Sequence, residues 1–429
     1  MGNSDAGSDE RDPSRHLASQ QDDRTISRRK ALASIASVGL LGLAGWRLRS
    51  GSSGVKPLWE RNFEAASTVS PPAGTDEHVV VGGQDKQLHG LTAGGDRLFT
   101  VGTGGPIETR PVVPKSGGPV HVHSTDGDLY TVGLSGELLW RVEGQAFDGW
   151  LGRQGSFLVS VDPVADVIAG YDAREGTRRF QRSAHEYPFP TLSDSACLFP
   201  ATNPDGETKL VALAPTSGEV LWESSLRGGY PSVVAGGDRL VTVCDSTVRM
   251  RRASDGHILW RTAVAGDVTS HFGPPLWVGE HVYVRAGRDD RPDEFVAIDR
   301  DSGSVQWRRS VGYELETVTT TSQGVFVASS VDDPDGGILI RLDAFTLDGT
   351  RQWQTTTDVT ISGTVAALGR AGSVLFVASD HEIEAYDPNT GARRWQYDPQ
   401  SRRIGVTAAD SALYVSHTDN GGIARLPTS

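Results

Sequence analysis

The stretch FVAIDRDSGSVQW at residues 295–307 decides the fold, because the same pattern returns along most of the chain. A short apolar strand ends at Asp299, a turn follows at Gly303, and a second strand ends on Trp307. Eight units place a glycine four positions before an aromatic residue. The glycines are Gly95, Gly136, Gly176, Gly218, Gly256, Gly303, Gly349 and Gly391. The aromatic residues, 38 to 47 positions apart, are Phe99, Trp140, Phe180, Trp222, Trp260, Trp307, Trp353 and Trp395.

Each part of the unit has a physical reason. Glycine supplies the positive φ of a tight hairpin turn. In the strand that follows, alternation lets aromatic and aliphatic side chains point inward while Arg, Glu or Gln point outward. The terminal aromatic is large enough to fill the wedge between adjacent sheets. Three further strands precede the turn in each unit. Examples of the first, second and third, taken from two neighbouring units, are residues 317–320, 281–284 and 295–299. Four short antiparallel strands in about 40 residues predict the blade of an all-β propeller.

The two ends of the repeat region predict how the ring closes. Residues 404–426 offer three strands without a fourth, and residues 57–63 form a lone strand with the expected aromatic at Trp59. Pairing the two leaves no free sheet edge. The count then favours nine blades in a single propeller over residues 57–429, while eight stays open.

The segment AYDPNTG at residues 385–391, with Trp395, resembles the tryptophan-docking repeat of the pyrroloquinoline-quinone (PQQ)-like propeller family. That family includes the quinoprotein alcohol dehydrogenases and the propeller lipoprotein of bacterial outer-membrane protein assembly. The resemblance covers nearly all of residues 57–429 and implies a propeller, usually of eight blades. Phe99 and Phe180 depart from the pattern, where the family has tryptophan. The repeated residues are structural, so the resemblance specifies the fold better than the function.

The first 56 residues are expected to lie outside the fold. Residues 1–26 are polar and acidic and are predicted to be disordered. In residues 27–46, Arg28 and Arg29 precede an apolar run over 31–46, which resembles a twin-arginine export signal. A retained membrane anchor is the alternative for the same run. Residues 47–56 are predicted to be a linker, and the propeller to be extracytoplasmic, either secreted or anchored to the cell membrane.

Composition limits the partners and the chemistry. The formal net charge of -13 argues against nucleic acid, which basic surfaces bind. Arginine-rich, lysine-poor and acidic usage resembles that of proteins from halophilic archaea, and high genomic GC content is the alternative. The only two cysteines, Cys197 and Cys244, exclude a disulfide-dense scaffold. We expect two buried free thiols, with a bridge between them as the alternative.

Lengthened loops suggest where the ring binds a ligand. Three repeats carry extra residues between their second and third strands, at 203–206, 288–293 and 332–336. Insertions at one place in the repeat map to one face of the ring, which also carries the connections between blades. The polar and aromatic residues expected on that face are Trp150, His185, Tyr187, Tyr230, His271, Phe272 and Tyr313. Wedge-filling or solvated loop residues are the alternative interpretation of this set.

Two patterns in the sequence suggest a metal site, and neither is favoured. Asp333 and Asp335 put two carboxylates near a turn, as calcium sites do, but no twelve-residue ligand pattern follows. His121 and His123 share one face of a strand, but no third ligand is evident, so a partly exposed strand is favoured over a metal pair.

The function predicted from the sequence is non-catalytic binding or scaffolding at the cell envelope, with a protein or another envelope component as the partner of a monomeric propeller. The alternative is a PQQ-dependent dehydrogenase. The resemblance implies that such enzymes carry an adjacent cysteine pair and large insertions, and neither is found here. No catalytic, cofactor-binding or metal residue is therefore assigned, and PQQ and calcium stay open as cofactors without being favoured.

Overall fold

Short antiparallel β-strands follow one another along residues 59–426, as the repeat predicts. The computed structural model describes residues 54–429 except 64, 115–116, 145–148, 163–164, 184–189, 203–207, 227–231, 245, 265–275, 288–291, 323, 334–337, 361–366, 380–381, 400, 402–403 and 418–419. The predicted disordered segment and export signal, with Arg28 and Arg29, lie outside the described residues. Within the described part of the chain, no helix is long and apolar enough to cross a membrane.

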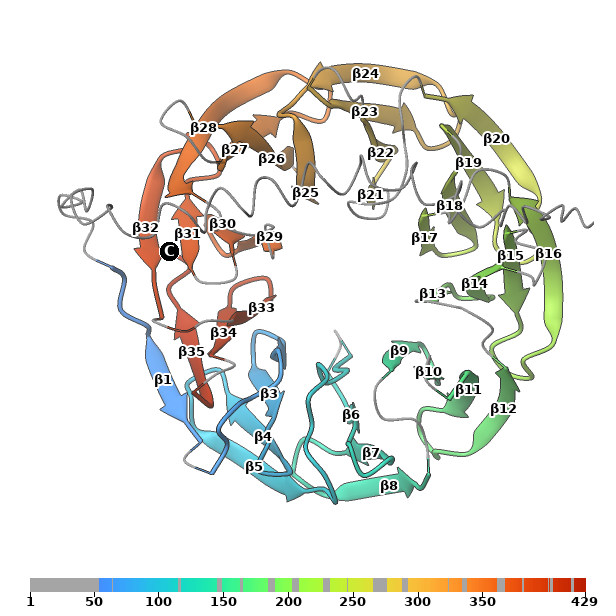
Figure 1. The fold of residues 1–429 in the computed structure, drawn as a ribbon, viewed down its shortest axis with the longest axis vertical. Coiled ribbons are helices and arrows are strands. Elements are labelled where there is room, and N and C mark those ends of the chain that lie inside the picture. The colour runs from blue at the N-terminus through green and yellow to red at the C-terminus, as the bar shows by residue number, and fades with distance from the viewer. Residues whose placement is uncertain are drawn as a thin grey trace, which may run out of the picture. The chain divides into compact units, whose positions relative to one another are not determined.

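Nine antiparallel sheets surround a common axis as the blades of a propeller (Figure 1). We number the blades 1 to 9 along the chain and give their strands from the axis outward. Blade 1 consists of β2 (Ala73–Gly74), β3 (His78–Gly82), β4 (Gln87–Thr92) and β5 (Arg97–Gly102). Blade 2 consists of β6 (Val120–His123), β7 (Leu129–Val132) and β8 (Leu138–Val142). Blade 3 consists of β9 (Trp150–Gln154), β10 (Phe157–Asp162), β11 (Val167–Asp172) and β12 (Arg178–Ser183).

The middle of the chain forms the next three blades. Blade 4 consists of β13 (Thr191–Leu192), β14 (Cys197–Thr202), β15 (Thr208–Leu213) and β16 (Val220–Leu226). Blade 5 consists of β17 (Ser232–Gly236), β18 (Arg239–Cys244), β19 (Thr247–Arg252) and β20 (Ile258–Ala263). Blade 6 consists of β21 (Leu276–Val278), β22 (His281–Ala286), β23 (Glu294–Asp299) and β24 (Val305–Ser310).

The last three blades complete the ring. Blade 7 consists of β25 (Glu314–Thr320), β26 (Val325–Asp332), β27 (Ile338–Phe345) and β28 (Arg351–Thr360). Blade 8 consists of β29 (Ala367–Ala371), β30 (Val374–Ala378), β31 (Ile383–Tyr386) and β32 (Arg393–Tyr397). Blade 9 consists of β33 (Ile404–Ala408), β34 (Leu413–His417), β35 (Gly422–Leu426) and β1 (Trp59–Asn62).

Blade 2 departs from the predicted four strands. Its sheet has three, and the innermost strand is reduced to a single bridge between Val112 and His121. Pro111 and Pro114 flank this bridge and have no backbone N–H to donate to a sheet. The prolines therefore explain why the repeat loses one strand here.

The predicted closure and the count of nine blades are confirmed. β1 pairs antiparallel with β35, from Trp59 opposite Arg425 to Asn62 opposite Gly422. Beside this seam, the Asp76 carboxylate of blade 1 accepts hydrogen bonds from the backbone N–H and the hydroxyl of Ser411 in blade 9, at 2.7 and 2.9 Å. The two ends of the chain thus build one sheet together.

The glycine and aromatic positions of the repeat meet between blades. All eight hairpin glycines have a positive φ, from 67° to 90°, as predicted. Each also lies against the aromatic ring of the preceding blade, where an added Cβ would come within 2.4 to 2.7 Å of ring-bearing side-chain atoms. The pairs begin with Gly95 on Trp59 and end with Gly391 on Trp353. Each hairpin is therefore docked on its neighbour.

Indole N–H groups reinforce five of these contacts. The N–H of Trp307 donates to the carbonyl of Leu347 at 2.9 Å, within the hairpin of the next blade. Equivalent bonds of 2.7 to 2.9 Å start from Trp59, Trp222, Trp260 and Trp353. The aromatic thus joins blades by packing and by a directed hydrogen bond.

Trp395 is the one aromatic residue of the repeat that supports no hairpin glycine, because the third and fourth strands of blade 9 are not joined by a hairpin. The third and fourth strands of that blade, β35 and β1, come from opposite ends of the chain. Val55 packs in the cluster that contains Trp395, and its N–H donates to the carbonyl of Gln396 at 2.9 Å. The residues that precede β1 therefore occupy the place of the missing hairpin.

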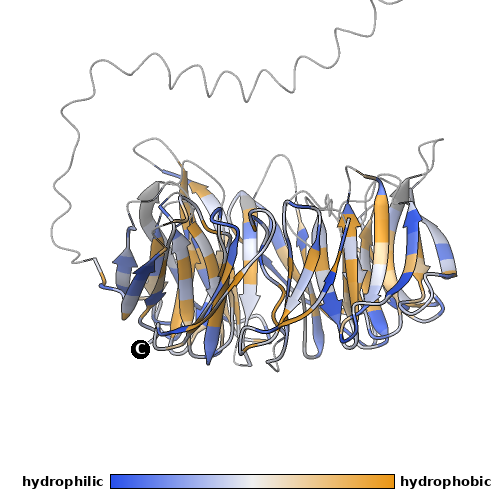
Figure 2. Cartoon of the chain, turned by 90° about the horizontal axis from the view of Figure 1, so that it is seen from below, coloured by the Kyte–Doolittle hydropathy of each residue, from blue (hydrophilic) through white to orange (hydrophobic). Residues whose placement is uncertain are grey.

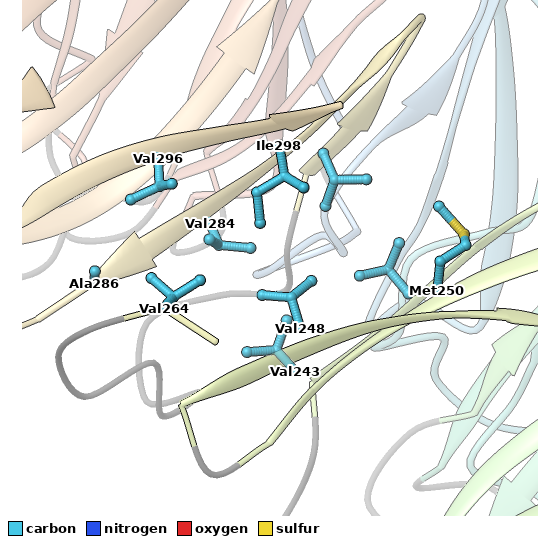
Figure 3. Packing of buried hydrophobic residues seen from close by; sticks show 10 residues of the cluster. Val243, Val248, Met250, Val264, Val284, Ala286, Val296 and Ile298 are labelled. Carbon is cyan, nitrogen blue, oxygen red and sulfur yellow. The ribbon is translucent and has the colours of Figure 1, made fainter. Parts of the chain in front are cut away.

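The hydrophobic core lies mainly between blades. Val243, Val248 and Met250 of blade 5 pack against Val284 and Ile298 of blade 6 (Figure 3). Seen from the side, hydrophobic residues run along the strands between the two ends of the ring (Figure 2). Cys197 and Cys244 belong to two different clusters and form no disulfide, which confirms two buried thiols.

The outermost strands do not follow the predicted alternation. The aliphatic residues that precede the aromatics remain exposed, with Leu138 51%, Val220 42% and Leu221 44% accessible. The expectation that aliphatic side chains of this strand point inward is therefore wrong. Blades diverge toward the circumference, so no neighbouring sheet is near enough to cover these positions.

Candidate functional site

The two ends of the ring carry different connections. The glycine hairpins between third and fourth strands, such as that at Gly303, lie at one end, which we call the turn face. Because neighbouring strands are antiparallel, the loops between second and third strands lie at the other end, together with the connections between blades. We call that end the insertion face, and the loop between Asp332 and Ile338 is an example. The three predicted insertions all fall there.

Two of the seven predicted binding residues lie in the described part of the chain. His185, Tyr187, Tyr230, His271 and Phe272 lie outside it. Trp150 is half-buried at the start of β9 and packs on the blade 3 and 4 cluster that includes Val161 and Phe199. Its ring fills the space over Gly152, where a Cβ would lie 1.9 Å from it. Trp150 therefore fills a wedge in the core of the ring.

Tyr313 is exposed on the insertion face. It belongs to the connection between β24 and β25, and 56% of its surface is accessible. Its N–H donates to the carbonyl of Ser330 at 2.9 Å, which fixes its backbone to β26. The exposed aromatic ring is therefore attached to a backbone that is held in place by a hydrogen bond.

Blade 7 has the longest strands among the described residues, and Tyr313 directly precedes its innermost strand. Its β26, β27 and β28 have 8, 8 and 10 residues. Ile338 at the start of β27 pairs with Asp332, and its surface is 48% exposed. Tyr313, Ile338 and Asp332 form what we call the blade 7 platform.

A buried carboxylate holds the connection that carries Tyr313. Asp293, fully buried at the end of the second insertion, pairs with the Arg285 guanidinium at 2.6 Å. The same carboxylate oxygen accepts the Leu315 N–H at 2.9 Å. The Asp293 backbone also exchanges two hydrogen bonds with Val311 and Gly312. The sequence marked Asp293 only as part of an acidic loop, whereas it anchors that loop to blade 7.

The metal predictions have different outcomes. In the proposed calcium loop, Asp333 is described and residues 334–336 are not. Among the described residues, no three His, Cys, Asp or Glu side chains converge on a point where they could hold a metal ion. Cys197 and Cys244 also lie in different blades. The described residues therefore do not fit the quinone and calcium centre of the family's enzymes.

His121 and His123 are buried, so the expectation of a partly exposed strand is wrong. His121 is hydrogen-bonded to the Thr131 hydroxyl at 2.6 Å and to Arg153 at 3.3 Å, and His123 to the Ser160 hydroxyl at 3.2 Å. Burial lowers the pKa of His121 to about 3 and that of His123 to about 4. Both rings are neutral at pH 7 and join blade 2 to blade 3 through polar contacts.

Two cavities that the sequence did not indicate open near the turn face. A cavity of about 540 Å³ is lined by Asp76, Arg110, Arg370 and Asp410, which belong to four different blades. A second cavity of about 240 Å³ lies between blades 7 and 8 and shares Arg370. The larger cavity joins segments about 300 positions apart and the smaller one joins two blades, so no local motif marks either cavity.

Comparison with known proteins identifies the family. A family model described as "Outer membrane protein assembly factor BamB" matches residues 206–344 and, in a second overlapping match, 244–421. Together the two matches span half of the chain. The chain belongs to this family of PQQ-repeat propellers. Membership agrees with the propeller fold and with the docked glycine and aromatic pairs between the blades, and the nine sheets are one more than the eight that the resemblance implied.

Solved structures similar to this family member share its fold. BamB from Moraxella catarrhalis is 13% identical, with a TM-score of 0.50 over 86% of this chain and 96% of that chain. The computationally designed Ika8 protein is 15% identical, with a TM-score of 0.51 over 88% and 100%. A eukaryotic initiation factor is 12% identical, with a TM-score of 0.59 over 85% and 93%. No curated protein matches the sequence.

Proposed function

We propose that this propeller is an exported, non-catalytic binding or scaffold protein of the cell envelope, and that its partner docks on the insertion face. The observation that carries the proposal is the blade 7 platform, in which a largely exposed tyrosine and an exposed isoleucine lie at the insertion end of the same blade. Aromatic anchors of this kind supply much of the energy of protein interfaces. The family supports the cell-envelope location, because the description of its model names an outer membrane assembly factor.

The hydrogen-bonded backbone around Tyr313 also favours the blade 7 platform as a binding surface. Asp293 and Ser330 hold the connection on both sides of Tyr313 through hydrogen bonds to the backbone. A side chain that is already positioned loses little conformational freedom when a partner binds. Tyr313 and Ile338 therefore present a preorganised apolar contact with a carboxylate, Asp332, at its edge.

The test compares the two ends of one blade. Full-length protein with Tyr313→Ala and Ile338→Ser is cross-linked in its native envelope next to wild type, and captured proteins are identified by mass spectrometry. The matched control is Leu347→Ser, since Leu347 is 36% exposed in the turn-face hairpin of the same blade. The proposal requires a defined partner that wild type and control capture and the double variant loses by about tenfold or more. Capture that survives the double variant, or that the control abolishes, contradicts it.

A separate titration tests the enzymatic alternative. Purified protein is mixed with PQQ and calcium, and absorbance and dye-linked alcohol oxidation are followed. Saturable quinone binding with turnover would replace the scaffold proposal by a quinone-dependent enzyme.

A further inference from the structure

The larger cavity lies inside the ring, away from the insertion face. The innermost segments of four consecutive blades line it: β29 of blade 8, β33 of blade 9, β2 of blade 1 and residues 110–113 of blade 2. Asp76 and Asp410, in the loops that follow β2 and β33, place it toward the turn face. Its volume of about 540 Å³ is within the range of small-molecule sites.

Arg110 brings into this cavity a positive charge that has no ion-pair partner among the described residues. Its guanidinium donates to the carbonyl of Val406 at 2.7 Å and so connects blade 2 with blade 9. No carboxylate of the described residues lies within ion-pair distance of it. The surrounding walls displace part of the water around Arg110 and lower the pKa of its guanidinium, while the side chain stays exposed to solvent in the open cavity. An anion in the cavity would compensate this loss of hydration.

Arg370 supplies a second guanidinium from the opposite wall. Its Nε donates to the carbonyl of Gly372 at 3.1 Å, which orients the group. Within the described part of the chain its two terminal nitrogens have no hydrogen-bond or ion-pair partner. Because Arg370 lines both cavities, its terminal nitrogens are accessible to a ligand.

The two carboxylates of the lining, those of Asp76 and Asp410, differ in the hydrogen bonds that they accept. The Asp76 carboxylate oxygen already accepts two hydrogen bonds from Ser411. Asp410 accepts a hydrogen bond from the Gly372 N–H through its backbone carbonyl, so its carboxylate, like that of Asp76, remains a negative charge of the wall. Asp410 therefore weakens the attraction of the site for an anion.

From this arrangement we propose that the cavity is a binding site for a small organic carboxylate, held between Arg110 and Arg370. A guanidinium presents parallel N–H donors that match the two oxygens of a carboxylate. Two such groups on opposite walls suit a dicarboxylate. The site is at the other end of the ring from the blade 7 platform, so this proposal can be tested independently of the proposed scaffold role.

The experiment is a calorimetric titration of the full-length protein with succinate at low ionic strength, where screening of charge is weakest. Wild type should bind succinate, and Arg370→Gln should weaken binding by about tenfold. Arg110→Gln should do the same, with its thermal midpoint measured because this residue also bridges two blades. Arg182→Gln, an exposed arginine of β12 outside the lining, serves as the matched control and should bind as wild type does.

Asp410→Asn gives a test of opposite sign. Removing a like charge should tighten succinate binding by about two- to threefold. Absence of binding to wild type at millimolar succinate, unchanged binding by Arg370→Gln, or weaker binding by Asp410→Asn would each overturn the proposal. Tighter binding of inorganic phosphate than of succinate would overturn the assignment of the ligand class.

Discussion

Gly349 lies directly on the indole of Trp307, and a Cβ at Gly349 would come within 2.6 Å of two ring atoms. The glycine also has a φ of 81°. Because glycine has no side chain, it can adopt the turn conformation of blade 7 and at the same time contact the indole of blade 6. The relationship recurs around the ring and is the main joint between blades.

Gly349→Ala should therefore lower the free energy of unfolding by about 2–4 kcal/mol, because it strains the backbone and overlaps the ring. Gly237→Ala is the matched control, since Gly237 has a φ of 59° but no atom within 4 Å of its Cβ position. That control should cost only about 1 kcal/mol. Denaturant unfolding followed by circular dichroism measures both. Equal losses in the two variants would show that the contact with Trp307 adds nothing.

Trp59 should be the most sensitive residue of the seam. Its indole supports Gly95, lies 6.2 Å from the ring of Tyr414, and donates to the carbonyl of Ala93 at 2.7 Å. Trp59→Ala should cost about 3–5 kcal/mol, because Trp59 is the only apolar side chain of β1 and packs on the next blade. Trp59→Phe keeps a ring and removes the N–H, so it should cost about 1 kcal/mol. The two denaturation midpoints should differ clearly, and coincident midpoints would refute the role of packing.

The buried imidazoles should make the ring sensitive to acid. The pKa of His121 falls to about 3 in the fold, whereas an exposed histidine titrates near 6.5. The unfolded chain therefore binds more protons below about pH 6.5, so stability declines as the pH falls from there toward 3. His121→Gln should reduce the loss of stability between pH 7 and pH 4.5 by about 2 kcal/mol. The exposed His257→Gln should leave that loss unchanged. An equal loss in wild type and His121→Gln would contradict the assignment.

Both thiols should be inert while the ring is folded. Burial raises the pKa of Cys197 to about 12, so almost no thiolate exists at pH 8, and Cys244 is 3% exposed. Iodoacetamide at pH 8 should label neither residue in buffer and both in denaturant, as intact-mass spectrometry can show. Omitting reductant should make no difference, because the two residues form no disulfide. Labelling of the native protein within minutes would disprove the burial.

The repeat could be predicted from the sequence because its determinants are local. The turn at Gly303 and the strand that ends on Trp307 need only a few neighbouring residues to specify them. The docking of each glycine on the preceding aromatic could not be derived this way, since it joins residues about 40 positions apart. Closure was predictable for a different reason: a lone strand at one end and a missing strand at the other are complementary.

Positions near the axis and between blades were harder to predict. His121 and His123 alternate as an exposed face would, but blade 3 covers that face, and its position depends on the whole ring. Arg110 and Arg370 have no motif in common, and only the ring brings them to one cavity. The one available signal was an arginine in each of two otherwise apolar inner segments. The register of the repeat alone places Tyr313 in an inter-blade connection, between β24 and β25, and its role in binding stays a prediction.

The joint β1–β35 sheet imposes an order on biogenesis. Residues 59–62 are synthesised long before their partner strand β35, which ends at Leu426. The blades in between can stack as they emerge, but the opening strand stays unpaired until β35 has been made. The ring can therefore close only after the strands of all nine blades have left the ribosome.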